Sequence, residues 1–155
     1  MAHHAFSLYA HITWHTWQRV GCISESAARH VKTALDNASS VTKIRILERA
    51  VLVDHVHVLV SFRPDSSLSE FVRLAKSGAG YRANHVIDGT LKWARGFYAA
   101  SVSRAELPRR CAYIRAQFEK HPERIPRHTR EPADPGRQPG VYKYRGQRTL
   151  LRLAT

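Results

Sequence analysis

The sequence predicts an α+β domain with a ferredoxin-like, mostly antiparallel sheet and helices packed on one face. Segments with strand-type alternation and segments with helix-type spacing follow one another in the order β-α-β-β-α-β-α. At 155 residues the chain is long enough to bury a core. Five of its seven prolines fall within residues 122–140. We therefore expect a folded domain over residues 1–121 and a proline-rich, basic C-terminal segment over residues 122–155.

The first half of the chain predicts a strand, a helix and a pair of strands. Residues 6–19 are rich in aromatic and β-branched residues that alternate, which is typical of a strand. Residues 25–38 contain good helix formers with an apolar stripe at helical spacing, and Ser24 or Ser26 can cap their start. Residues 41–53 alternate again and predict a strand. A tight turn near Asp54 then leads into a second strand that ends at Phe62.

The second half predicts a helix, a strand and a last helix. Proline and polar turn formers at residues 63–66 end the preceding strand. Ser67 and Glu70 have the spacing of a capping box, so a helix begins here. A short strand is expected over residues 97–102, and a helix from Pro108 to about His121, before Pro122. The buried stripes of the two helices are expected to be Leu68, Phe71, Val72 and Ala75, and Leu107, Cys111, Ile114 and Phe118.

The charge balance is the strongest global signal. The chain has 25 Lys and Arg against 12 Asp and Glu, a formal charge of +13 and a pI of about 10.6. Such an excess favours a polyanion partner, and nucleic acid is the most general one. No run of about 18 apolar residues suggests a membrane span. The first residues lack the layout of a signal peptide, so we expect a cytoplasmic protein, and the isolated Cys22 and Cys111 predict reduced thiols.

Two histidines interrupt an otherwise apolar strand. In VLVDHVHVLVSF, residues 51–62, His55 and His57 are two positions apart. Side chains of a strand alternate between faces, so both imidazoles point the same way. Asp54 is expected to point to the opposite face. Paired imidazoles suit a metal ion, but the same pattern also occurs in satisfied polar clusters.

The last predicted helix adds two further polar side chains. Tyr113 and Gln117 are four residues apart and therefore stand one turn above the other. They lie to one flank of the apolar stripe, at the edge of the predicted core. Taken alone, a tyrosine and a glutamine at a partly exposed boundary carry no function.

In combination, these motifs resemble the single-tyrosine HUH transposases of small bacterial insertion sequences, which include the REP-associated tyrosine transposases. The resemblance covers roughly residues 6–121. It rests on HVH followed by Tyr113 and Gln117 in the same order and at a similar distance. The supporting segments are YAHITWHTWQR, DHVHVLVSF, SLSEFVRLAKSGAGYR and SVSRAELPRRCAYIRAQFEKH. After His121 the sequence departs from the family pattern.

The resemblance implies a DNA transposase that cleaves and rejoins single-stranded DNA through a 5′-phosphotyrosine. Tyr113 would be the catalytic nucleophile, and His55, His57 and Gln117 would hold a divalent metal, Mg²⁺ or Mn²⁺. Single-stranded or hairpin DNA would be the partner. A homodimer is expected, with a monomer as the alternative, and neither a membrane nor a small-molecule cofactor is expected.

Basic and aromatic residues outside the motif are candidates for DNA contacts. Unpaired bases can stack on Trp17 and Trp93, whereas Trp14 is expected to pack in the core. The expected phosphate contacts are Arg19, Arg73, Lys76, Arg82 and Arg95.

Two other functions remain open from the sequence. A metal hydrolase would use His55 and His57 with an activated water and would need no Tyr113. A non-catalytic basic protein derived from such a transposase would bind hairpin DNA without cutting it.

Overall fold

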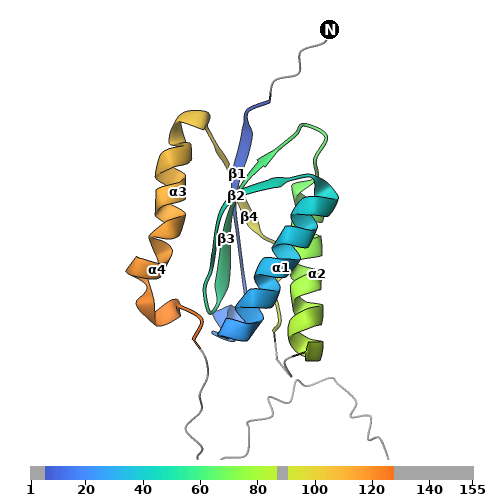
Figure 1. Cartoon of the computed structure of the whole chain (residues 1–155), viewed down its shortest axis with the longest axis vertical. Helices are drawn as coiled ribbons and strands as arrows, with labels where there is room; N and C mark the ends of the chain where they lie inside the picture. The colour runs from blue at the N-terminus through green and yellow to red at the C-terminus, as the bar shows by residue number, and fades with distance from the viewer. Residues whose placement is uncertain (1–5, 87–90, 128–155) are drawn as a thin grey trace, which may run out of the picture.

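The computed structural model describes residues 6–86 and 91–127, which form one antiparallel sheet with helices on both of its faces (Figure 1). The sheet has four strands in the order β2-β3-β1-β4. The strands are β1 (Leu8–His15), β2 (Arg45–Val51), β3 (His55–Phe62) and β4 (Tyr98–Val102). The helices are α1 (Glu25–Thr42), α2 (Leu68–Val86), α3 (Leu107–Arg115) and α4 (Gln117–Lys120). The predicted α+β class and the order of the elements are confirmed.

The helices lie on both faces of the sheet, whereas the sequence predicted helices on one face only. Helices α1 and α2 pack side by side against one face, and α3 lies on the other (Figure 1). The alternation along β3 explains this division, because Val56, Val58 and Val60 belong to the cluster under α1 and α2, whereas Leu59 contacts the α3 side. Both faces of the central strand are therefore buried.

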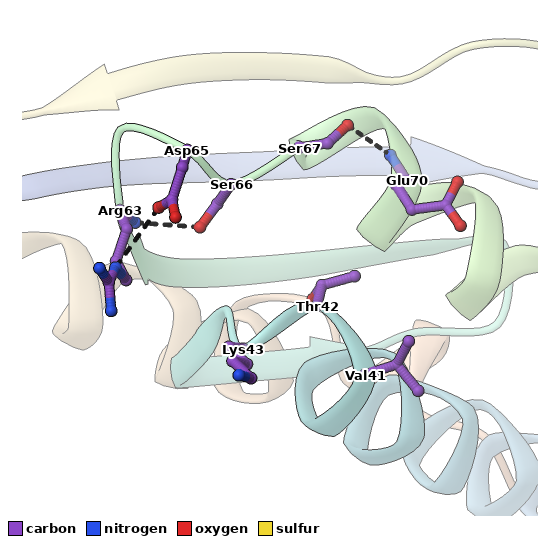
Figure 2. A pocket seen from close by; sticks show the side chains of 8 residues that line it. All are labelled: Val41, Thr42, Lys43, Arg63, Asp65, Ser66, Ser67 and Glu70. Atoms are coloured by element: carbon purple, nitrogen blue, oxygen red, sulfur yellow. Dashed lines mark hydrogen bonds and ion pairs between the residues drawn. The ribbon is translucent and has the colours of Figure 1, made fainter.

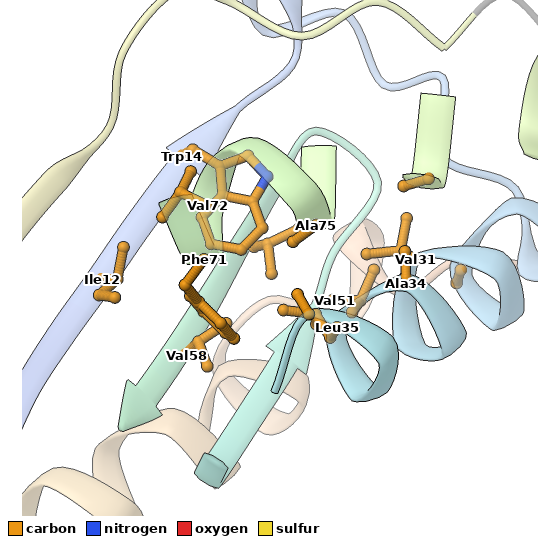
Figure 3. Close-up of a cluster of buried hydrophobic side chains, with 14 of the residues drawn as sticks. Ile12, Trp14, Val31, Ala34, Leu35, Val51, Val58, Phe71, Val72 and Ala75 are labelled. Carbon is orange, nitrogen blue, oxygen red and sulfur yellow. The ribbon is translucent and has the colours of Figure 1, made fainter. Parts of the chain in front are cut away.

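The larger core lies between the sheet and the helices α1 and α2 (Figure 3). Trp14 is 2% exposed and Phe71 is fully buried in this core, as expected from the sequence. The predicted apolar stripes of α1 and α2 face it. The two helices approach closely where Gly78 lies opposite Ala34, and a Cβ at Gly78 would come within 3.3 Å of the Ala34 Cβ.

The structure corrects the bounds of two predicted elements in the first half. The first strand ends at His15 instead of residue 19, because the chain turns into the short 3₁₀ helix η1 (Trp17–Arg19) with Gln18 and Arg19 at positive φ. Residues 41–42 belong to α1, not to the following strand. The helix ends at Thr42, and the following Lys43 has a φ of 56°. Val41 is consequently 70% exposed and does not belong to the core.

The last predicted helix is divided into α3 and α4 at Ala116. Its expected apolar stripe packs on the sheet in a second cluster, in which Ile114 is fully buried against Leu59 and Val102. Residues 122–127 also contact the domain, since the amide of Val53 donates to the carbonyl of Arg124 at 2.9 Å. The rest of the predicted C-terminal segment, residues 128–155, lies outside the described residues.

In the two described ranges, no helix combines the length and the apolar character needed to cross a membrane.

Candidate active site

The pairing of β1 with β3 assembles a histidine cluster on the face that α3 covers. In this antiparallel register Thr13 lies opposite His57, and His15 lies opposite His55. Because side chains alternate along each strand, His11 and Thr13 share a face with His57. His55 and His57 do point to the same side, and their ring centroids are 4.9 Å apart.

His57 is held by two side chains of β1. Its Nδ1 lies 3.0 Å from Nε2 of His11 and 3.2 Å from Oγ1 of Thr13. The rings of His11 and His57 are stacked, with centroids 5.2 Å apart. Since these contacts occupy Nδ1, Nε2 is the nitrogen of His57 that remains for a ligand.

His55 is held by Asp54, contrary to the expectation that Asp54 points away from the histidines. Asp54 lies in the turn before β3, where strand alternation does not apply, and its Oδ1 is 2.6 Å from Nδ1 of His55. A second carboxylate oxygen lies 3.7 Å from the guanidinium of Arg124. The carboxylate therefore orients the imidazole and leaves its Nε2 for a ligand.

The imidazoles are neutral at physiological pH. Burial, followed by the nearby His55, His11 and His121, lowers the pKa of His57 to about 3. Burial and the charge of Arg110 lower the pKa of His11 to about 4. Burial also lowers the pKa of His55, although the hydrogen bond to Asp54 opposes this shift. Neutral imidazoles are the form that ligates metal ions.

Helix α3 brings Tyr113 to the histidine cluster within the same chain. The ring centroid of Tyr113 lies 6.0 Å from that of His57 and 6.0 Å from that of His11. Tyr113 is 39% exposed, so its ring touches the cluster on one side and solvent on the other.

Gln117 lies one turn beyond Tyr113 and is 3% exposed. Its Nε2 donates to the backbone carbonyl of Tyr113 at 3.2 Å, which leaves the amide oxygen as an acceptor. Tyr113, four residues before Gln117 on the same helical path, approaches His57. Gln117 is therefore on the helix face that is turned toward the histidines.

The five basic residues predicted to contact DNA are spread over the molecule. Arg19 contributes to the lowered pKa of His55, after burial and Arg124, and so lies near the cluster. Arg73 is exposed but forms a two-pronged ion pair with Glu70, at 2.6 and 2.7 Å. The Nζ of Lys76 donates to the carbonyls of Ala94 and Gly96. The remaining two, Arg82 and Arg95, are exposed.

The aromatic residues proposed for base stacking also differ in exposure. Trp17 is 42% exposed, and Lys92 Nζ lies 4.8 Å from the centre of its ring. Trp93 is half-buried, donates its Nε1 to the carbonyl of Lys76 and meets Trp14 edge to face.

Sequence reasoning missed His11, Thr13 and two cations beside Tyr113. His11 stands in an alternating strand with Thr13 two residues later, which signals a polar strand face, but the sequence does not show which strand that face meets. Arg110 and Lys120 are three residues before and seven residues after Tyr113 on the same helical path. Their guanidinium carbon and Nζ lie 5.9 and 5.6 Å from the centre of its ring.

The histidine cluster supplies part of a donor set for a metal ion. In residues 6–86 and 91–127, no group of three or more His, Cys, Asp or Glu side chains has the arrangement of a metal site. The cluster offers two imidazole nitrogens, His55 Nε2 and His57 Nε2. A third protein donor would have to be of another type, and the amide oxygen of Gln117 is a candidate.

A hollow of about 470 Å³ lies at the other end of the sheet (Figure 2). Side chains from the end of α1, the turn after β3 and the start of α2 line it, among them Lys43, Arg63 and Glu70. His55 is the first residue of β3, and Arg63, eight residues after His55, directly follows the end of the strand. At about 3.3 Å per residue the two places are some 25 Å apart, so this hollow is separate from the histidine cluster.

Two solved structures share the fold. A crystal structure from Deinococcus radiodurans R1, assigned as a transposase, has a TM-score of 0.59 and 20% identity, covering 76% of this chain and 95% of the other. The structure of a REP-associated tyrosine transposase bound to a REP hairpin has a TM-score of 0.62 and 14% identity, covering 78% of this chain and 74% of the other. No curated protein sequence matches the chain.

A family profile that matches most of the chain defines its class as that of the transposases. Residues 4–117 match the sequence profile of the family described as "Transposase IS200 like". The chain belongs to this family of IS200-like transposases.

Proposed function

We propose that the protein cleaves and rejoins single-stranded DNA by metal-assisted transesterification, with Tyr113 as the nucleophile and a 5′-phosphotyrosine as the intermediate. The observation that carries this proposal is the approach of Tyr113 to His57 in one chain, at 6.0 Å between ring centroids. Residues from two distant parts of the sequence meet there, and one of them is a group that can form a phosphodiester bond with DNA.

The proposed covalent step is a direct exchange of esters. A bond forms between Tyr113 Oη and a backbone phosphorus, and the bond from that phosphorus to the 3′-oxygen breaks. The phenol proton passes to solvent, and the departing 3′-oxygen takes up a proton to become a 3′-hydroxyl. The reverse attack by a 3′-hydroxyl restores a phosphodiester and the phenol, so rejoining needs no external energy.

A divalent cation, Mg²⁺ or Mn²⁺, is the proposed cofactor. We propose that His55 and His57 hold it through Nε2 and that Gln117 contributes its amide oxygen. The donor set fits, because both imidazoles are neutral and each Nδ1 is engaged by another group. When bound, such an ion polarises the phosphate and neutralises developing charge. The protein itself positions Tyr113 and keeps the imidazoles oriented and unprotonated.

Single-stranded DNA with a hairpin is the proposed substrate. The charge of +13 supports a polyanion partner. The structural neighbour bound to a REP hairpin has the same fold and supports a hairpin as the ligand. We propose residues 1–121 as the catalytic domain and residues 122–155 as an additional basic segment for DNA.

One assay tests the proposal against its alternatives. The protein is incubated with Mg²⁺ and 3′-labelled single-stranded DNA from the region that flanks its gene, then denatured and resolved by gel electrophoresis. A labelled protein band that is lost in Tyr113→Phe supports the proposal, because the 3′ fragment stays attached through its 5′-phosphate. Tyr98→Phe is the matched control, since Tyr98 is exposed and lies outside the cluster.

The alternatives give different results in the same assay. Cut DNA without a protein adduct would indicate the metal hydrolase, and bound but intact DNA would indicate the non-catalytic hairpin-binding protein. Either result contradicts the proposed transesterification.

The expected homodimer bears on whether Tyr113 acts in its own subunit. The 6.0 Å approach of Tyr113 to His57 within one chain supports action in the same subunit. We expect that a mixture of Tyr113→Phe and His57→Ala subunits forms no adduct. Recovery of the adduct in the mixture would show that the tyrosine of one subunit serves the histidines of its partner.

A further inference from the structure

Four side chains of α3 and α4 form one polar stripe along the helices. Arg110, Tyr113, Gln117 and Lys120 follow the spacing i, i+3, i+7, i+10, which keeps them on one side of a helical path. Both cations lie beside the tyrosine ring, with the Arg110 guanidinium 5.9 Å and the Lys120 Nζ 5.6 Å from its centre. Arg110 also lies close enough to His11 to lower its pKa, after the larger effect of burial.

These two cations differ from Arg115 and Arg124 in forming no ion pair among the described residues, although the charge of Arg110 does add to the hydrogen bonds from Ser103 that lower the pKa of the exposed Glu106. Arg115 is paired with Glu48, and Arg124 is paired with Asp54 and Glu123. In the part of the chain that the structure describes, neither Arg110 nor Lys120 takes part in an ion pair with a carboxylate. Two such cations beside a half-exposed phenol create a local positive field that an anion can occupy.

We propose that Arg110 and Lys120 form a phosphate-binding pair that holds a backbone phosphate of single-stranded DNA against Tyr113 Oη. This inference rests on the proposed function. A phosphate between the two cations receives charge-assisted hydrogen bonds from both, and the planar guanidinium of Arg110 matches two phosphate oxygens at once. The pair thus performs two tasks: it places the phosphorus next to the nucleophile, and it compensates the charge that develops there during attack.

The pair changes neither the bonds nor the protons of the proposed reaction. The Oη–phosphorus bond still forms, the bond to the 3′-oxygen still breaks, and the phenol proton still passes to solvent. Arg110 keeps its proton throughout. The pair therefore acts on the position and the charge of the phosphate alone.

The test compares Arg110→Gln, Lys120→Gln and the double variant with Arg109→Gln. Arg109 is the matched control, because it is exposed, precedes Arg110 in the same helix and has no contact with Tyr113 among those that the structure describes. The first measurement is binding of a random-sequence single-stranded 30-mer with EDTA present, at NaCl concentrations from about 50 to 300 mM. Each lost phosphate contact is expected to reduce the slope of log K against log salt by about 0.7. In the double variant this slope should fall by about 1.4, and in Arg109→Gln by much less.

The second measurement is the rate of adduct formation at saturating DNA with Mg²⁺. Loss of a preorganised charge at the reacting phosphate is expected to slow this rate by roughly 10²-fold in the double variant. Arg110→Lys keeps the positive charge but lacks the planar guanidinium that binds two oxygens at once. Its rate of adduct formation is expected to lie between those of the wild type and Arg110→Gln.

Each outcome has a defined meaning. A double variant that matches Arg109→Gln in both salt slope and adduct rate overturns the phosphate-binding pair. A reduced slope with an unchanged adduct rate overturns its placement at Tyr113. If wild-type protein forms no adduct while the double variant still loses slope, the proposed transesterification fails and the phosphate-binding pair stands.

Discussion

The contacts of His57 with β1 lead to a prediction about metal affinity. His11→Leu removes the 3.0 Å contact to Nδ1 of His57 but fills most of the same buried space, and Thr13→Val removes the 3.2 Å contact without changing the shape of the side chain. Either change leaves His57 and its Nε2 in place. The two variants therefore keep the proposed ligand itself and remove the side chains that orient it.

The expected magnitude follows from the number of contacts that remain. Loss of the outer partner of a metal-ligating imidazole costs about 10- to 100-fold in metal affinity. In each single variant one partner is left on Nδ1, so we expect a loss near the lower limit of about 10-fold, or ~1.4 kcal/mol. The double variant leaves Nδ1 without either side-chain partner and should lose about 100-fold, or ~2.7 kcal/mol.

Isothermal titration with Mn²⁺ at neutral pH in the absence of DNA measures this affinity, and electron paramagnetic resonance of free Mn²⁺ provides an independent value. His85→Ala is the control for removal of a histidine, because His85 is exposed on α2, on the opposite side of the sheet. Thermal unfolding establishes that each variant is folded. Unchanged Mn²⁺ affinity in a folded double variant would refute the orienting role of His11 and Thr13, and absence of Mn²⁺ binding by the wild type would refute the proposed metal site itself.

Three further predictions concern the rest of the site and its support. Asp54→Ala removes the 2.6 Å partner of His55 and should reduce Mn²⁺ affinity by about 10-fold in the same titration, whereas Asp65→Ala, in the turn after β3, should leave it unchanged. Ile114→Ala leaves a cavity between α3 and the sheet and should lower the free energy of unfolding in urea by about 2–5 kcal/mol; an unchanged midpoint would mean that α3 does not depend on this contact. Gly80→Ala should raise that free energy by about 0.5–1 kcal/mol, because a Cβ there meets nothing within 4 Å. In Gly78→Ala the free energy of unfolding should rise less, because the new Cβ would lie only 3.3 Å from the Cβ of Ala34. An equal rise in both variants would contradict the close packing of α1 on α2.

Local periodicity was sufficient for the elements and their buried faces. The apolar spacing of 107, 111, 114 and 118 predicted which side of the last helix packs on the sheet, and Ile114 is fully buried there. Strand alternation placed His55 and His57 on one face. The predicted bounds are wrong at element ends, for example at Val41. There the helix continues to Thr42, and the hydroxyls of Ser39 and Thr42 donate to backbone carbonyls.

The partners of the histidines could not be predicted in the same way. Strand alternation predicts the wrong side for Asp54 because this residue lies in a turn, where the backbone no longer has a period of two. Arg110 and Lys120 were missed because a basic residue on an amphipathic helix is usually a solvated one, and only the position of the helix shows what lies beside it.

The sequence by itself determined the order of the elements, the faces that each one buries, and the shared direction of His55 with His57 and of Tyr113 with Gln117. These properties depend on backbone periods that act over a few residues. The tertiary structure decided that α3 covers the histidine face, that His11 meets His57, and that Tyr113 reaches both. Those contacts join residues 46 or more positions apart in the chain, and they depend on strand register and on which face a helix covers, which only the packing of the whole domain determines.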